Sequence, residues 1–301
     1  MAKGGLGRIA VIAIPYVWLL VFFLAPFAIV LKIALSETAI AQPPYVPVLD
    51  LQAGWAGFAE FLSELDFDSF TYLLSDSLYA KAFLSSLTIA SLSTLFALLV
   101  AFPLAYGMAR APERWRAILL MLVILPFWTS FLIRVYAWIG ILRPEGLLNA
   151  FLLWAGLISE PLQILNTPVA VYIGIVYSYL PFMVLPIYST LEKMDDSLLE
   201  AAIDLGCTRT SAFWLVTLPL ALPGIVAGCF LVFIPAMGEF VIPDLLGGSS
   251  TLMMGKTLWS EFFSNRDWPV ASAVAIVLLL ALVVPILIFQ RQAERQQEAG
   301  R

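Results

Sequence analysis

One carboxylate lies deep inside an apolar stretch of the chain, where an ionised group is costly. Glu239 follows Gly238 and is flanked by Pro235 and Pro243. Proline removes a backbone donor and loosens a helix, and irregular backbone at such depth is tolerated where it lines a cavity. A carboxylate held there predicts attraction for a positively charged ligand.

Aromatic rings and a second acid could assist Glu239. Ring faces attract ammonium groups by about 0.5–2 kcal/mol each. The predicted substrate path therefore comprises Glu239 and Asp244 with Trp128, Tyr136, Tyr177 and Tyr179. A competing interpretation pairs Glu239 with Arg134, since rise per residue places both in the outer half of their apolar stretches. The sequence leaves both interpretations open.

The sequence argues against an enzyme. Gly255-Lys256-Thr257 looks like the end of a phosphate-binding loop, but that motif requires a glycine five positions earlier, where Ser250 stands. The chain has no histidine, so its two cysteines cannot form a Cys/His metal site. We therefore expect no catalytic residue, no metal and no cofactor bound by this chain.

Composition predicts the elements that position these residues. Hydrophobic residues make up 61% of the 301 residues and charged residues 12%, about half the charged fraction of a soluble domain. Mean hydropathy is +0.95. The chain is therefore predicted to be an all-α polytopic membrane protein, one transmembrane domain over residues 1–301. Six apolar runs are long enough to cross a bilayer: 9–35, 82–109, 117–142, 169–191, 220–241 and 270–289.

The basic residues predict the orientation of these six spans. Lysine and arginine collect before the first span, between the second and third, and after the sixth, which places both termini in the cytoplasm. Residues 36–81 form an acidic external loop, and 192–219 a cytoplasmic loop. Residues 147–154 are too short to span and are expected to lie along the interface. Ala39-Ile40-Ala41 resembles a signal-peptidase site, but the preceding apolar run is too long, so we expect a retained first helix.

The 192–219 loop carries its own helix signals. Ser197 and Glu200 stand at capping-box spacing, which predicts a reciprocal cap. Leu198, Ala202 and Leu205 fall on one helical face. Gly206 is placed to stop the helix in a left-handed conformation. The sequence therefore predicts a short, stiff helix with a surface that another protein can approach closely.

This loop resembles a known signature. Glu200-Ala201-Ala202, then Gly206, then Val216-Thr217-Leu218-Pro219 are similar to the EAA motif of permease subunits of ATP-binding-cassette importers. The resemblance implies the type I (MetI-like) permease architecture. The stretches 235–243 and 265–269 look like the polyamine branch of the family, closest to putrescine-type permeases.

The resemblance also implies roles and partners. Glu200, Ala201, Ala202, Asp204, Leu205 and Gly206 would dock on a separate ATPase, where ATP and magnesium bind. The expected partners are a second homologous permease, two ATPase copies, a periplasmic polyamine-binding protein and membrane lipid, with no nucleic acid. The expected location is the bacterial inner membrane. An importer for thiamine, a metal complex or sulfate remains an alternative, as does a secondary transporter.

Overall fold

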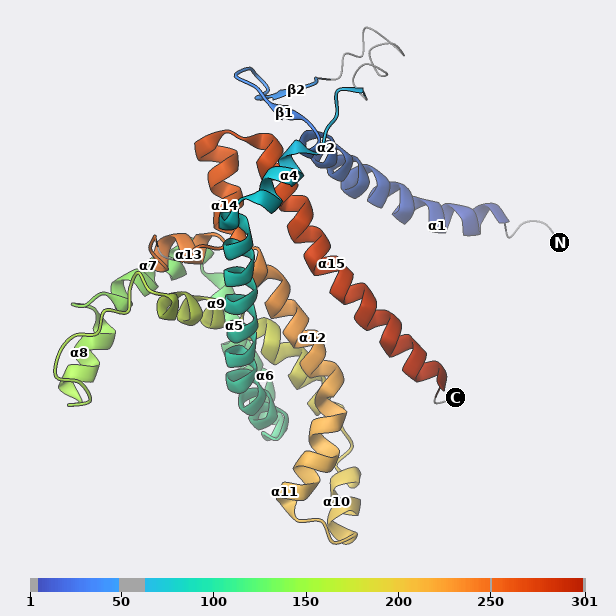
Figure 1. Cartoon of the computed structure of the whole chain (residues 1–301). Coiled ribbons are helices and arrows are strands. Elements are labelled where there is room, and N and C mark those ends of the chain that lie inside the picture. The colour runs from blue at the N-terminus through green and yellow to red at the C-terminus, as the bar shows by residue number, and fades with distance from the viewer. Residues whose placement is uncertain (1–4, 49–62, 250, 300–301) are drawn as a thin grey trace. The chain divides into compact units, whose positions relative to one another are not determined.

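The computed structural model describes residues 5–48, 63–249 and 251–299 and is mostly helical (Figure 1). The chain divides into two compact units. The first comprises Met1–Ala80 with Thr257–Arg301, and the second comprises Lys81–Lys256. Helices α5 (Ser77–Ala109) and α14 (Met254–Trp259) each cross a boundary between these units in the sequence.

The first unit joins both ends of the chain. Its elements are α1 (Gly5–Leu19), η1 (Leu20–Leu24), α2 (Ala25–Ala34), β1 (Glu37–Thr38), β2 (Tyr45–Val46), α4 (Asp68–Ser75), η4 (Ser260–Asn265) and α15 (Trp268–Ala299). The two strands form an antiparallel hairpin in which Glu37 faces Val46. Helices α2 and α4 pack against α15. The Thr38 hydroxyl donates to the Asp267 carboxylate at 2.7 Å and ties the hairpin to the start of α15.

The second unit holds both candidate sites. Its elements after α5 are α6 (Glu113–Ile124), η2 (Leu125–Trp128), α7 (Phe131–Leu142), α8 (Leu147–Trp154), α9 (Pro168–Glu192), α10 (Ser197–Asp204), α11 (Arg209–Ala212), η3 (Phe213–Thr217), α12 (Leu218–Met237) and α13 (Val241–Leu246). Helix α8 covers the predicted interfacial segment. Trp154 at the end of this helix is exposed. That α8 lies along the membrane interface stays a prediction.

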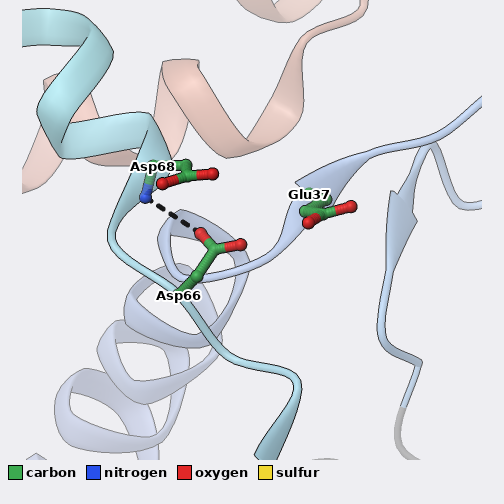
Figure 2. Close-up of side chains that lie close together, drawn as sticks. All are labelled: Glu37, Asp66 and Asp68. Carbon is green, nitrogen blue, oxygen red and sulfur yellow. Dashed lines mark hydrogen bonds between the residues drawn. The ribbon is translucent and has the colours of Figure 1, made fainter.

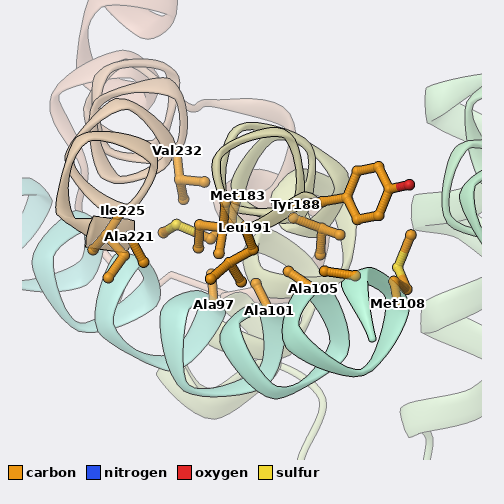
Figure 3. Close-up of a cluster of buried hydrophobic side chains, with 13 residues drawn as sticks. Ala97, Ala101, Ala105, Met108, Met183, Tyr188, Leu191, Ala221, Ile225 and Val232 are labelled. Carbon is orange, nitrogen blue, oxygen red and sulfur yellow. The ribbon is translucent and has the colours of Figure 1, made fainter. Parts of the chain in front are cut away.

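The core of this unit is a close packing of α5, α9 and α12 (Figure 3). Ala97, Ala101 and Ala105 recur every four residues on α5, so the small side chains form one stripe facing the other two helices. On α12, Gly224 and Gly228 are the small residues that face the neighbouring helix α9. A Cβ atom on Gly224 would lie 2.6 Å from the Pro186 carbonyl oxygen, and one on Gly228 2.8 Å from the Met183 sulfur. Small residues let helices approach closely where lipid supplies no hydrophobic drive.

The helices are long and apolar enough to form several spans. Four qualify singly: Val11–Ala34, Ser77–Ala109, Pro168–Glu192 and Arg209–Met237. A fifth is possible if the bent pair Glu113–Trp128 and Phe131–Trp154 counts as one, and Trp268–Val283 is a shorter apolar helix within the described residues. A multi-span helical protein is therefore confirmed. Six spans with both termini in the cytoplasm remain a prediction.

The third predicted span, 117–142, is not one continuous helix. Its two halves meet at 91°. Pro126 lacks the amide that would continue the α-helical ladder, the chain tightens into η2, and Thr129 and Ser130 are extended. The helix of the fifth predicted span ends earlier than expected, because α12 stops at Met237 and the backbone is irregular until Val241.

Candidate functional site

Helix α10 ends as the sequence predicted. Gly206 has a φ of +90°, the left-handed region that glycine adopts without strain. The Cys207 amide donates to the Ala202 carbonyl at 3.0 Å, and the Gly206 amide donates to the Ile203 carbonyl at 2.9 Å. This pair of bonds is the Schellman pattern, which satisfies carbonyls that a helix end leaves free. The left-handed stop at Gly206 is therefore confirmed.

The start of α10 differs from the prediction. Ser197 is the first helical residue rather than the cap, so the predicted capping box with Glu200 does not form. The Asp195 carboxylate instead accepts a hydrogen bond from the Ser197 amide at 2.9 Å. That backbone hydrogen bond holds the pKa of Asp195 below its ordinary value. The first helical amide is therefore capped by Asp195, two residues before the position of the predicted cap, and the N-cap residue Asp196 makes no side-chain cap bond.

Apolar side chains of α10 and η3 are left exposed by the described residues of the chain. Leu198 and Ile203 are each 45% exposed, and Leu205 is 87% exposed. Trp214 and Leu215 on η3 are also exposed. Among the predicted docking residues, Glu200, Ala201, Asp204 and Gly206 are exposed and Ala202 is half-buried. Exposed apolar groups gathered in one place mark interaction surfaces.

The hairpin formed by α10, α11 and η3 is tied to the end of α5. Arg110, one residue beyond α5, forms an ion pair with Asp196 just before α10. Its guanidinium also lies 5.6 Å from the centre of the Tyr106 ring. Phe213 meets Tyr106 edge-on, with ring centres 5.9 Å apart. This attachment joins residues 86 positions apart, and the sequence analysis did not detect it.

Glu239 lies in the irregular segment between α12 and α13 and is only 7% exposed. Its Oε1 accepts hydrogen bonds from the amides of Val241 at 3.0 Å and Ile242 at 3.3 Å. Its Oε2 accepts one from the Tyr179 hydroxyl of α9. The carboxylate therefore caps the first turn of α13, where amide donors favour negative charge, and holds α9 to the break.

An open pocket of about 580 Å³ surrounds this carboxylate. Its walls come from three parts of the second unit: the bend between η2 and α7, the middle of α9, and the break after α12. The lining residues are Phe127, Phe131, Arg134, Ser178, Tyr179, Phe182, Pro235, Gly238, Glu239, Phe240 and Val241. The pocket thus combines a buried anion, a cation and several aromatic rings.

Residues 97–295 match the family model described as the inner membrane component of binding-protein-dependent transport systems. The chain belongs to this permease family. It is accordingly a multi-pass protein of the bacterial inner membrane and a non-catalytic transport subunit.

Individual relatives give a more specific match than the family model. The permease is 41% identical over 280 residues to the spermidine/putrescine transport system permease protein PotB of Haemophilus influenzae, covering 93% of this chain and 92% of that one. It is 44% identical over 236 residues to the Escherichia coli protein of the same name, covering 78% and 85%. These matches place the permease in the polyamine branch that the sequence motifs indicated.

A solved structure supports the fold. The crystal structure of a bacterial alginate transporter, in complex with an alginate pentasaccharide-bound periplasmic protein, aligns with a TM-score of 0.68. The alignment covers 95% of the permease and 93% of that chain at 19% identity. The two chains therefore share the permease fold.

The pocket of the permease contains only part of the predicted substrate path. Glu239 and Tyr179 are brought together, but Trp128 and Tyr136 are 72% and 59% exposed and do not line this pocket. Tyr177 packs edge-on against Trp138 instead, with ring centres 5.3 Å apart. The sequence analysis missed the other rings of the pocket, since only the bend between η2 and α7 brings Phe127 and Phe131 to the break.

Asp244 has a partner within the permease. Its carboxylate lies 3.3 Å from the Lys256 ammonium, which also donates to the Gly248 carbonyl at 3.2 Å. Gly255 packs on the break, because a Cβ there would lie 2.3 Å from the Gly238 carbonyl oxygen and 2.6 Å from that of Glu239. Gly255 and Lys256 thus have structural contacts that account for their presence in the sequence. The spacing of the Gly-Lys-Thr stretch does not fit a phosphate-binding loop.

The acidic segment that was predicted to be external gathers three carboxylates. Glu37, Asp66 and Asp68 lie with ligand oxygens within 4.8 Å of one another (Figure 2). The Asp66 carboxylate accepts a hydrogen bond from the Asp68 amide at 2.9 Å, which caps the start of α4. Exposed acidic groups of this kind need no ion, so the cluster is not assigned a binding role.

Proposed function

We propose that the permease is one half of the pore of an ATP-driven polyamine importer, with putrescine the first candidate cargo and spermidine the second. The observation that carries this proposal is the 41–44% identity to the two PotB proteins over most of the chain. Those relatives are named for spermidine and putrescine together, so the order of the two cargoes rests on the sequence resemblance alone.

The chemistry of the Glu239 pocket supports a cationic cargo. The Glu239 carboxylate accepts three hydrogen bonds and has lone pairs left for a further donor. The Phe127, Phe131 and Phe182 side chains offer apolar surface for methylene groups and ring faces for ammonium groups. A flexible chain with an ammonium at each end fits both features.

The α10–η3 hairpin supports coupling to a partner. In this proposal its uncovered face docks on a cytoplasmic ATPase, with Glu200, Ala201, Ala202, Asp204, Leu205 and Gly206 at the contact. The Schellman stop and the Asp195 cap stiffen both helix ends, so the helix moves as one body. ATP and magnesium bind to that partner. A second permease, a second ATPase copy and a periplasmic polyamine-binding protein complete the complex.

Transport by the reconstituted complex tests the cargo. Radiolabelled putrescine should accumulate in vesicles only when the ATPase, ATP and the binding protein are all present. Unlabelled putrescine and spermidine should compete, whereas thiamine and sulfate should not. Accumulation without ATP would favour a secondary transporter and contradict the proposal.

A second candidate cargo class follows from Arg134, which lines the same pocket as Glu239. A guanidinium offers only donors, so it is suited to a solute that bears acceptor groups, such as sulfate. If sulfate is transported and polyamines do not compete, the importer role stands and the polyamine assignment is wrong.

A further inference from the structure

Arg134 is a charged residue whose donors are poorly satisfied. Its Nε and Nη1 atoms are buried and have no hydrogen-bond partner within the described residues. Its guanidinium lies 5.2 Å from the centre of the Phe127 ring and 5.8 Å from that of Phe131. Ring faces attract the charge but accept little from the N–H groups. Buried donors without acceptors are rare and costly, so each one requires an explanation.

The pocket contains one anionic side chain that could pair with Arg134. Among its lining residues, Glu239 is the only carboxylate. The two side chains face the same 580 Å³ space, yet they are not among the ion pairs within 4.0 Å in the described chain. A polyamine cannot take the place of Glu239, because protonated amines donate hydrogen bonds and Arg134 also only donates.

Both charged residues stand next to breaks in their helices. Arg134 lies in the first turn of α7, directly after the extended residues Thr129 and Ser130. Glu239 lies between the end of α12 and the start of α13. A few residues outside regular helix can absorb the backbone rotation that brings two neighbouring elements together. The separation of Arg134 from Glu239 can therefore change without unfolding either helix.

We infer that Arg134 is the exchangeable counter-ion of Glu239 and competes with the cargo for it. This inference rests on the proposed function in one respect, that the pocket lies on the cargo's route. When an ammonium group occupies Glu239, Arg134 stays on the Phe127 and Phe131 rings. When the ammonium leaves, Arg134 moves to the carboxylate. This pairing compensates the Glu239 charge after release, and the returning guanidinium displaces the cargo and hinders its rebinding.

Uptake kinetics test the competition. Arg134→Gln removes the competitor, so the KM for putrescine should fall by about tenfold while the maximal rate also falls, because release loses its displacing group. Arg134→Lys keeps the charge and should stay near the parent KM. Arg143→Gln, the same change at the exposed residue that ends α7, is the matched control and should change neither value. An unchanged or raised KM for Arg134→Gln would overturn the inference.

ATP hydrolysis by the complex without cargo gives a readout that does not depend on which solute is carried. If the two residues pair when the pocket is empty, Arg134→Gln, Glu239→Gln and the double variant should shift the basal rate by a similar factor, about fivefold. Independent effects that multiply in the double variant would overturn the inference. Should polyamines fail to compete for uptake while this coupling is present, the cargo assignment is wrong and the pairing of Arg134 with Glu239 in the empty pocket stands.

A failure of Arg134→Gln to assemble is also decisive. The loss of a counter-ion should be relieved by removing the carboxylate as well, so the double variant with Glu239→Gln should recover assembled complex. Absence of this rescue would assign Arg134 a static structural role and overturn the exchange.

Discussion

The α10–η3 hairpin and the Glu239 pocket are built in opposite ways. The hairpin is continuous in sequence, and its cap, its stop and its exposed face follow from residues a few positions apart. The pocket is assembled from three distant segments, of which two contribute a helix break and the third is the part of α9 around Pro181. A docking surface can be specified by residues that are close together in the sequence. A cavity that admits a solute depends instead on where separate helices depart from regular helical geometry.

The largest expected effect is at the close-approach face of the hairpin. Ala202→Arg places a long cation on a half-buried position of α10. Uptake should fall by about a hundredfold or more, because a bulky charge at a packed interface core is strongly destabilising. The measurement is uptake together with co-purification of the ATPase. Ala155→Arg, at the exposed C-terminal end of α8, a helix that also has eight residues, is the control. Normal uptake by Ala202→Arg would show that this face is not docked.

The second prediction concerns the charge of the pocket. Glu239→Gln keeps an oxygen for the α13 amides but removes the negative charge. The KM for putrescine should rise by about tenfold to a hundredfold with assembly retained, in line with loss of a hydrogen bond to a charged group. Glu192→Gln is a matched control, since Glu192 also accepts a tyrosine hydroxyl bond, from Tyr188 at 2.7 Å, outside the pocket. Loss of folded protein for Glu239→Gln alone would indicate a structural carboxylate.

A third prediction separates the stiffness of the hairpin from general stability. Gly206 and Gly156 both have positive φ, and a Cβ on either would meet no atom within 4 Å. Replacing either by alanine should cost about 1–2 kcal/mol of local strain. Only Gly206→Ala should lower uptake, by about fivefold, since only it loosens the helix end that meets the partner. Equal losses of uptake for both variants would mean that the effect is one of folding.

The smallest effect is expected for the attachment of the hairpin to α5. Arg110 and Asp196 are 31% and 71% exposed, and pairs of this kind contribute about 0–1 kcal/mol. Arg110→Asp and Asp196→Arg should each lower uptake about twofold to threefold. The double variant restores a pair of opposite charges and should recover uptake at low salt. A double variant no better than either single would show that the pair transmits nothing.

The sequence predicted the hairpin and only part of the pocket, and the reason is physical. Gly206 could be assigned a left-handed stop because helix ends depend on nearest neighbours. The bend inside the third predicted span could not be foreseen, because hydropathy records apolar length and is insensitive to the break that follows Pro126. Arg134 was weighed only as a static partner of Glu239, since no pattern in the sequence reveals that its nitrogens lack acceptors.

The tight contact of α9 with α12 gives the permease a lever. At Gly224 and Gly228 the backbones of α9 and α12 are in close contact, so the two helices tilt together. Helix α12 has 20 residues, begins directly after η3 and ends at Met237, which makes it about 30 Å long. A tilt of about 5° at the hairpin end displaces the far end by about 2.6 Å, close to the length of one hydrogen bond. A movement too small to disturb packing at the pivot is thus enough to make or break a contact at Glu239.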